Sequence, residues 1–173
     1  IDLRDMDYIS WKRDMDEDLD TLSILISMVE DITPEYDYKL NQLIQVIREK
    51  EQKLINPGNR KVLIFTAFAD TAEYLYENIA PSAKKLGVNT ALVTGSAEGR
   101  TTIPNFKAEM NHVLSCFSPM SKDRDVLYPK DINNNIDILI GTDCISEGQN
   151  LQDCDYCINY DIHWNPVRII QRF

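Results

Sequence analysis

Basic residues are scarce in this chain. Its 173 residues include 18 Lys and Arg against 28 Asp and Glu, which gives a formal net charge of −10 at pH 7. A protein that binds nucleic acid by itself needs a surplus of Lys and Arg to neutralise phosphates. The composition therefore argues against an independent nucleic-acid-binding domain, although contacts through a few backbone N–H groups and hydroxyls are compatible with it.

Long hydrophobic segments are also missing. No stretch approaches the run of about 18 apolar residues that a membrane-spanning helix needs. The N-terminal segment "IDLRDMDYISWKRDMDEDLD" is acidic and has no apolar core of the kind that a signal peptide contains. The sequence therefore predicts a cytoplasmic protein without a membrane partner.

Histidine and cysteine are few. The four Cys include one Cys-x-x-Cys pair, Cys154 and Cys157, but a structural zinc site needs a second pair of ligands. The only histidines in the sequence are His112 and His163. We therefore expect no metal site, and we interpret the cysteines as reduced thiols that pack as small apolar side chains.

Two signatures of nucleotide hydrolysis are absent from the sequence. It contains no Gly-x-x-x-x-Gly-Lys-Ser/Thr loop, and no predicted strand ends in an Asp-Glu pair that could hold magnesium. Ser146, Asp161 and His163 are the residue types of a hydrolase triad, but no Gly-x-Ser-x-Gly turn surrounds Ser146. No complete catalytic site is found in these 173 residues.

The hydrophobic pattern alternates between helical and strand-like segments. Apolar residues at helical spacing predict helices over residues 15–32 and 38–55, with Asp37 as the N-cap of the second. Continuous apolar runs predict strands buried on both faces, separated by further helices. The expected strands are 61–68, 88–94, 136–142 and 155–161, the further helices are 70–86, 103–116 and one from Pro166, and residues 118–135 read as an irregular insertion. This order predicts an α/β fold with a mainly parallel sheet, preceded by an N-terminal helical segment.

Short polar groups follow the predicted strands, at the edge where ligands of such sheets bind. Gly141 and Thr142 close one strand, and Gly148 and Asn150 lie in the loop after it. A glycine lets the backbone approach a ligand, and Thr and Asn offer neutral hydrogen-bonding groups. This set suits a ribose or a phosphodiester better than bond cleavage. Asp143, without a fixed carboxylate neighbour, is interpreted as a buried, hydrogen-bonded turn residue and not as a metal ligand.

Taken together, several segments resemble the second RecA-like lobe of superfamily 2 helicases, and more narrowly the Swi/Snf-like ATPase group with its bacterial RNA-polymerase-associated branch. "KVLIFTAF" is similar to motif IV, "GTDCISEGQNLQ" to motif V and "YDIHWNPVRIIQR" to the approach to motif VI. The most group-specific part is the Asp-x-x-Trp-Asn-Pro spelling that starts at Asp161. The resemblance implies a RecA-like three-layer sandwich.

The resemblance further implies the second motor lobe of an ATP-dependent DNA helicase or translocase, with RNA left open as the nucleic acid. ATP with Mg²⁺ would bind only together with a first lobe of the same parent chain. The implied domain covers residues 37–173 after a lead-in over 1–36. The family's motif VI reads Gln-Arg-x-Gly-Arg-x-x-Arg, and this sequence contains its Gln171 and Arg172 before ending at Phe173. We therefore expect a domain truncated within motif VI and inactive in isolation.

Roles for individual residues also come from the resemblance. The resemblance implies that Gly148, Gln149 and Asn150 bind ATP near its ribose. It implies catalytic roles for Gln171, near the ATP phosphates, and for Arg172, which would help to shape the cleft. The residues that it implies for contact with nucleic acid are Thr66, Gly95, Ser96, Arg100 and Thr142. Glu147 departs from the family, which usually has Gly or Arg there. Two alternatives remain open: a non-catalytic RecA-like scaffold for protein–protein interaction, and an unrelated nucleotide-binding α/β enzyme.

Overall fold

The computed structural model describes residues 6–30, 32–95, 98–145, 148–162, 165, 167 and 172. The chain divides into two compact units, Ile1–Gln42 and Leu43–Phe173. The first unit contains helix α1 (Tyr8–Glu30) and the start of helix α2 (Tyr38–Gln52). No helix in the described part of the chain is both long and apolar enough to cross a bilayer.

Side-chain caps determine where the first two helices begin. Helix α1 starts at Tyr8, earlier than the predicted residue 15, because the Asp7 carboxylate accepts hydrogen bonds from the Ser10 N–H at 3.1 Å and the Ser10 hydroxyl at 2.7 Å. The apolar periodicity used for the prediction starts only further along the helix. The predicted N-cap of α2 is confirmed, since the Leu40 N–H donates to Asp37 Oδ1 at 2.9 Å.

The second unit is built on a five-stranded sheet in the order β3-β2-β4-β1-β5. The strands are β1 (Val62–Phe65), β2 (Thr90–Val93), β3 (Arg100–Thr101), β4 (Ile138–Gly141) and β5 (Cys157–Asn159). All neighbours pair in parallel except β3, which runs antiparallel to β2 at one edge. The four predicted strands are therefore confirmed. The prediction missed β3, because two residues in a polar string carry no strand periodicity.

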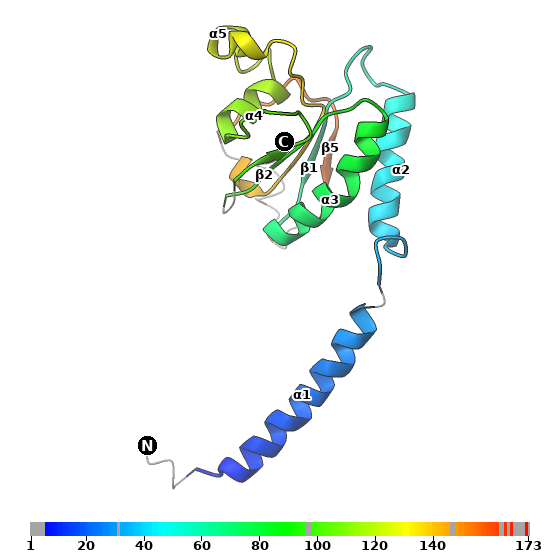
Figure 1. The fold of residues 1–173 in the computed structure, drawn as a ribbon, viewed down its shortest axis with the longest axis vertical. Coiled ribbons are helices and arrows are strands. Elements are labelled where there is room, and N and C mark those ends of the chain that lie inside the picture. Colours follow the sequence, from blue (N-terminus) through cyan, green and yellow to red (C-terminus); the bar gives the residue numbers. More distant parts are fainter. Residues whose placement is uncertain are drawn as a thin grey trace. The chain divides into compact units, whose positions relative to one another are not determined.

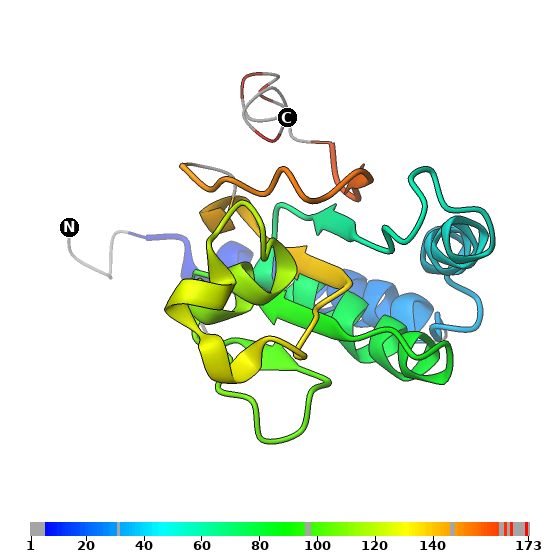
Figure 2. The ribbon, with the colours of Figure 1, turned by 90° about the horizontal axis from the view of Figure 1, so that it is seen from above.

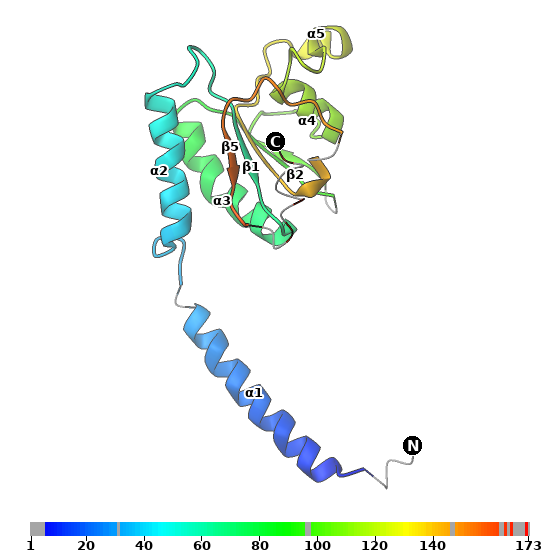
Figure 3. The same ribbon diagram turned by 180° about the vertical axis from the view of Figure 1, so that it is seen from behind.

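Helices cover both faces of this sheet (Figures 1 and 3). Alternate residues of a strand point to opposite faces, so each buried strand feeds two layers of core. Helix α3 (Ala69–Lys85) covers one layer of the core. Helix α2 packs beside α3, since Ile47 of α2 and Ile79 of α3 line one small apolar cavity. The other layer packs helix α4 (Met110–Phe117) against the sheet, with core residues Leu63, Phe65, Val93, Val113, Leu114, Phe117 and Leu139. The expected three-layer α/β class is confirmed.

Several helix boundaries differ from the prediction. Helix α4 starts at Met110 instead of residue 103, because Pro104 and the positive φ of Asn105, 57°, are incompatible with a helix there. Helix α3 continues through Pro81 and ends where Gly87 adopts a φ of 69°. The segment 118–135, expected to be irregular, contains helix α5 (Arg124–Leu127) and the 3₁₀ turn η2 (Pro129–Asp131). The helix expected from Pro166 falls mostly outside the described residues.

Gly99 allows two segments of backbone to approach each other. A Cβ at this position would lie 2.3 Å from the carbonyl oxygen of Ala108 and 3.2 Å from that of Leu92. Because neither oxygen can rotate away, we expect Gly99→Ala to reduce the free energy of unfolding by about 1–3 kcal/mol. Urea denaturation checks this. Gly95→Ala is the control, since its Cβ would meet only the Cβ of Cys144 at 3.5 Å. Equal losses in the two variants would contradict the prediction.

Candidate functional site

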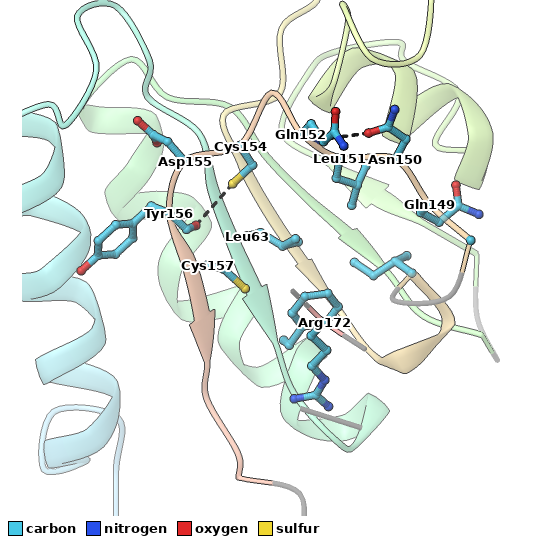
Figure 4. Close-up of a pocket in the computed structure, with 13 residues that line it drawn as sticks. Leu63, Gln149, Asn150, Leu151, Gln152, Cys154, Asp155, Tyr156, Cys157 and Arg172 are labelled. Carbon is cyan, nitrogen blue, oxygen red and sulfur yellow. Dashed lines mark hydrogen bonds between the residues drawn. The ribbon is translucent and has the colours of Figure 1, made fainter. Parts of the chain in front are cut away.

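A cavity of about 750 Å³ opens beside β1 and β5, on the α4 side of the sheet (Figure 4). Its floor comes from strand residues and its rim from the loop that connects the 3₁₀ turn η3 (Asp143–Ile145) to β5. The lining consists of Leu63, Phe65, Ile145, residues 148–152, residues 154–157 and Arg172. The cavity therefore combines an apolar base with a polar rim, an arrangement typical of small-molecule sites.

The three predicted ATP-binding residues lie together on this rim. Gly148 has a φ of 67°, a backbone conformation that favours glycine, and the space that a Cβ would occupy there is open. Gln149 and Asn150 follow it, and the Asn150 side chain accepts a long hydrogen bond of 3.4 Å from the Gln152 N–H (Figure 4). The structure thus places these residues on one side of the cavity. Contact with ATP stays a prediction.

Arg172 lies at the base of the same cavity, and its side chain is completely buried. Its guanidinium donates to Asp143 Oδ1 from Nε at 2.9 Å and from Nη2 at 2.6 Å. Nη1 donates to Asn159 Oδ1 at 2.8 Å, and the group lies 5.0 Å from the centre of the Phe65 ring. One side chain therefore joins the ends of β1, β4 and β5. Asp143 is thus a hydrogen-bonded turn residue as predicted, but its side chain is 28% exposed and not buried.

The contacts of Arg172 are those of a structural side chain, while the resemblance predicted a catalytic one. In this arrangement the guanidinium faces protein groups on several sides and has no exposed surface. These contacts hold the ends of three strands in place. Gln171, expected beside it at the phosphates, lies outside the described residues. A direct catalytic role for either residue remains a prediction.

Part of the predicted nucleic-acid track comes together at the carboxyl ends of the strands. Thr142 donates from Oγ1 to Cys144 Sγ at 3.4 Å, and a Cβ on Gly95 would lie 3.5 Å from Cys144 Cβ. Gly95 and Thr142 therefore flank the same residue. Thr66 is fully buried, and its hydroxyl donates to Asp161 Oδ2 at 2.5 Å. In this chain the Thr66 hydroxyl holds the segment after β5, and its contact with nucleic acid stays a prediction.

Arg100 lies apart from the residues around Cys144. Its guanidinium packs 4.8 Å from the centre of the Tyr76 ring and pairs with Glu77 Oε1 at 3.3 Å, so both partners belong to α3. The side chain is nevertheless about half exposed, at 48%. It can leave this weak surface pair for a phosphate at little cost. Ser96, the remaining predicted contact, lies outside the described residues.

The structure also reveals a buried ion pair that the sequence reasoning missed. Lys50 Nζ lies 2.6 Å from Asp155 Oδ1, with the two side chains 2% and 11% exposed, and it also donates to the Asn59 carbonyl at 3.0 Å. Asn56 Nδ2 donates to Asp155 Oδ2 at 2.9 Å. Burial acts to raise the pKa of Asp155, but the hydrogen bonds from Lys50 and Asn56 outweigh it and hold this pKa below its usual value. The sequence did contain a signal for the burial of Lys50. This residue follows the buried Leu43 and Ile47 of α2 at the spacing of three and four residues that marks one face of a helix.

Burial disfavours the thiolate form of three cysteines in this unit. Burial raises the pKa of Cys116 and of Cys157 to about 11, and it also raises the pKa of Cys154. Protonated thiols are poor nucleophiles and poor metal ligands.

Among the described residues, no group of three or more His, Cys, Asp or Glu side chains could hold a metal. Asp155 is the only carboxylate among the described lining residues, and Lys50 occupies it. The cavity therefore fits a neutral group such as a ribose better than a magnesium ion.

Residues 38–173 match the model of the family described as "Helicase conserved C-terminal domain". The chain therefore belongs to this family. Its mainly parallel sheet between helix layers agrees with the α/β fold that the sequence predicted for a helicase C-terminal lobe.

The chain is also similar to two curated relatives and to one solved structure. The chain is 28% identical over 178 residues to the "Uncharacterized ATP-dependent helicase YqhH" of Bacillus subtilis, and this alignment covers 98% of the chain and 25% of that protein. It is 27% identical over 136 residues to the "Putative ATP-dependent DNA helicase fml2" of Schizosaccharomyces pombe, and this alignment covers 78% of the chain and 15% of that protein. The crystal structure of the Pyrococcus furiosus Hef helicase domain superposes with a TM-score of 0.45 at 19% identity, over 78% of the chain and 22% of that structure. The chain thus spans a quarter or less of the curated relatives it matches.

Proposed function

We propose that this chain is the second motor lobe of an ATP-dependent DNA helicase or translocase, and that the nucleotide binds against the loop at residues 148–150. The observation that carries the proposal is the cavity of about 750 Å³ with Gly148 and Asn150 on its rim. The lobe's family and the motif order support it, as do two relatives whose names describe ATP-dependent helicases. The same support disfavours a scaffold without enzymatic function.

Each part of the lobe has a role in this proposal. Gly148 lets the backbone approach the ribose, and Asn150 offers its amide to a ribose hydroxyl. Thr142 and Gly95 face the nucleic acid at the strand ends, with Ser96, Thr66 and Arg100 as further predicted contacts. ATP supplies the free energy when it is bound between this lobe and a first lobe. The first lobe would hold Mg²⁺, since no described residue set here does so.

These roles imply that the 173 residues do not hydrolyse ATP by themselves. They contain no phosphate-binding Gly-x-x-x-x-Gly-Lys loop, and their net charge of −10 disfavours DNA binding by the lobe alone. Residues 1–36 would form a helical lead-in and 37–173 the lobe, close to the family match at 38–173. The Asp-x-x-Trp-Asn-Pro spelling supports the Swi/Snf-like branch, of which Trp164 and Pro166 lie outside the described residues. We place the protein in the cytoplasm, without a membrane partner.

A substitution on the cavity rim tests the nucleotide site. In the full-length protein, Asn150→Ala is expected to raise the KM for ATP about three- to tenfold, because it removes one neutral hydrogen bond to the ribose. DNA-stimulated ATP hydrolysis and binding of a fluorescent ATP analogue measure this. Asn133→Ala, an exposed change in the 118–135 segment, is the matched control. A folded full-length protein without ATP turnover on any nucleic acid would instead favour the scaffold.

A further inference from the structure

The segment 118–135 between α4 and β4 lies beside the loop that carries the proposed nucleotide site (Figures 2 and 3), and hydrogen bonds join the two. That loop, residues 148–156, has no helix or strand of its own. Within it, the Cys154 N–H donates to the Leu151 carbonyl at 3.0 Å, the Cys154 thiol donates to the Tyr156 carbonyl at 3.3 Å, and the Gln152 N–H makes the long bond to Asn150. The first two of these bonds lie in the second half of the loop, and the third is weak. Contacts from outside the loop must therefore help to place Gly148 and Asn150.

Asp153 provides the first of these contacts. Its carboxylate accepts hydrogen bonds from the Met120 N–H at 2.7 Å and the Ser121 N–H at 3.0 Å, and from the Ser121 hydroxyl. Its own carbonyl accepts from Asn59 Nδ2 at 2.9 Å. Hydrogen bonds to an ionised carboxylate are about twice as strong as neutral ones, and these three converge on one group. The end of the loop is therefore tied to the turn at residues 120–121.

Lys122 provides the second contact, at the start of the loop. Its Nζ donates to Gln149 Oε1, one residue from Gly148 and one from Asn150. The contacts of Asp153 and Lys122 thus hold the stretch 149–153 at both of its ends. Both come from one turn of the chain.

This turn is itself anchored in the core. It follows directly on α4, whose last residue Phe117 is fully buried, and the Ser118 N–H donates to the Leu114 carbonyl at 2.8 Å. The Lys122 N–H donates to the Ser118 carbonyl at 3.0 Å. Further along, the buried Arg124 donates from Nη1 to Asn135 Oδ1 at 2.7 Å, which closes the segment on itself. The turn is therefore a rigid support.

From this arrangement we infer that the segment 118–135 is a brace for the nucleotide-binding loop, and that Asp153 and Lys122 are positioning residues for ATP. The inference rests on the proposed function, because it concerns the same site. Neither side chain lines the cavity as a ligand group would need to: Asp153 and Lys122 act through the loop backbone and through Gln149. Losing them lets the loop sample conformations in which the rim does not match the ribose, which lowers affinity without changing the chemical step.

The experiment compares Asp153→Asn with the unmodified protein in two measurements. In the 173-residue chain, hydrogen–deuterium exchange should become about tenfold faster across residues 148–156 and at the Met120 and Ser121 amides, because an amide group cannot replace a carboxylate that accepts three bonds. In the full-length protein, the KM for ATP should rise about tenfold while kcat stays within about twofold. Lys122→Met should shift both in the same direction by less.

Asp125→Asn and Lys130→Met are matched controls, since both remove an exposed charge from the same segment without touching the loop. Unchanged exchange over 148–156 in Asp153→Asn overturns the brace. Faster exchange with an unchanged KM overturns the positioning role, as does a fall in kcat alone. If the unmodified full-length protein does not bind ATP, the proposed function itself is refuted. This measurement needs no variant, so the two failures can be told apart.

Discussion

Replacing Arg172 by alanine is expected to reduce the free energy of unfolding of this chain by about 3–5 kcal/mol. The guanidinium is completely buried and makes three hydrogen bonds to Asp143 and Asn159. Its removal withdraws the cation from Asp143 and leaves a cavity under the Phe65 ring. Urea denaturation of the 173-residue chain measures the loss.

Two further variants make the Arg172 result interpretable. Arg172→Lys keeps the charge but cannot reach both partners with a planar fork, so it should recover only part of the stability. Arg48→Ala, at an exposed position of α2, should change the free energy of unfolding by less than about 0.5 kcal/mol. If Arg172→Ala cost no more than Arg48→Ala, the cluster around Asp143 would not hold the strand ends together.

Lys50→Met is expected to have a comparable effect, about 3–5 kcal/mol, because it leaves Asp155 as a nearly buried carboxylate without its cation. Methionine preserves much of the length and apolar stem of lysine, so the loss reports the charge and its hydrogen bonds. The double variant Lys50→Met with Asp155→Asn should be more stable than Lys50→Met alone, since it removes the unpaired charge. Additive losses in this cycle would contradict a direct interaction.

The same ion pair makes stability depend on pH. The pKa of Asp155 in the folded chain lies below its unfolded value, so the unfolded state binds the proton more readily. The stabilisation by the pair is therefore complete above the unfolded pKa of about 4 and is lost as the pH falls through the folded pKa. Asp155→Asn should accordingly lose less stability than the unmodified chain between about pH 5 and pH 3. Parallel acid denaturation curves would show that Asp155 does not carry this dependence.

Most elements that build the lobe could be predicted from local sequence patterns. Strands such as Val62–Phe65 and Ile138–Gly141 are continuous apolar runs because both of their faces are covered, and this signal does not depend on distant residues. The cap at Asp37 and the stop at Gly87 are also local. The errors arose where a local signal was absent or contradicted, as at β3 and at Pro104 before α4.

The candidate site was only half predictable. The residues 148–150 could be placed at the strand edge from a motif, because glycine and short polar side chains are contiguous in the loop. The contacts that hold them could not, since they join residues far apart in the chain. Lys50 and Asp155 are separated by 105 positions, Ser121 and Asp153 by 32, and Arg172 and Asp143 by 29.

The sequence by itself therefore determined the α/β class, the mainly parallel sheet and the helicase motifs. Those features follow from the period of apolar residues and from short contiguous strings. Only the tertiary structure decided that Arg172 is buried against Asp143, that Lys50 pairs with Asp155 and that the 118–135 segment reaches the loop. The reason is physical: such pairs depend on the strand order β3-β2-β4-β1-β5 and its register, which bring distant residues within hydrogen-bonding distance.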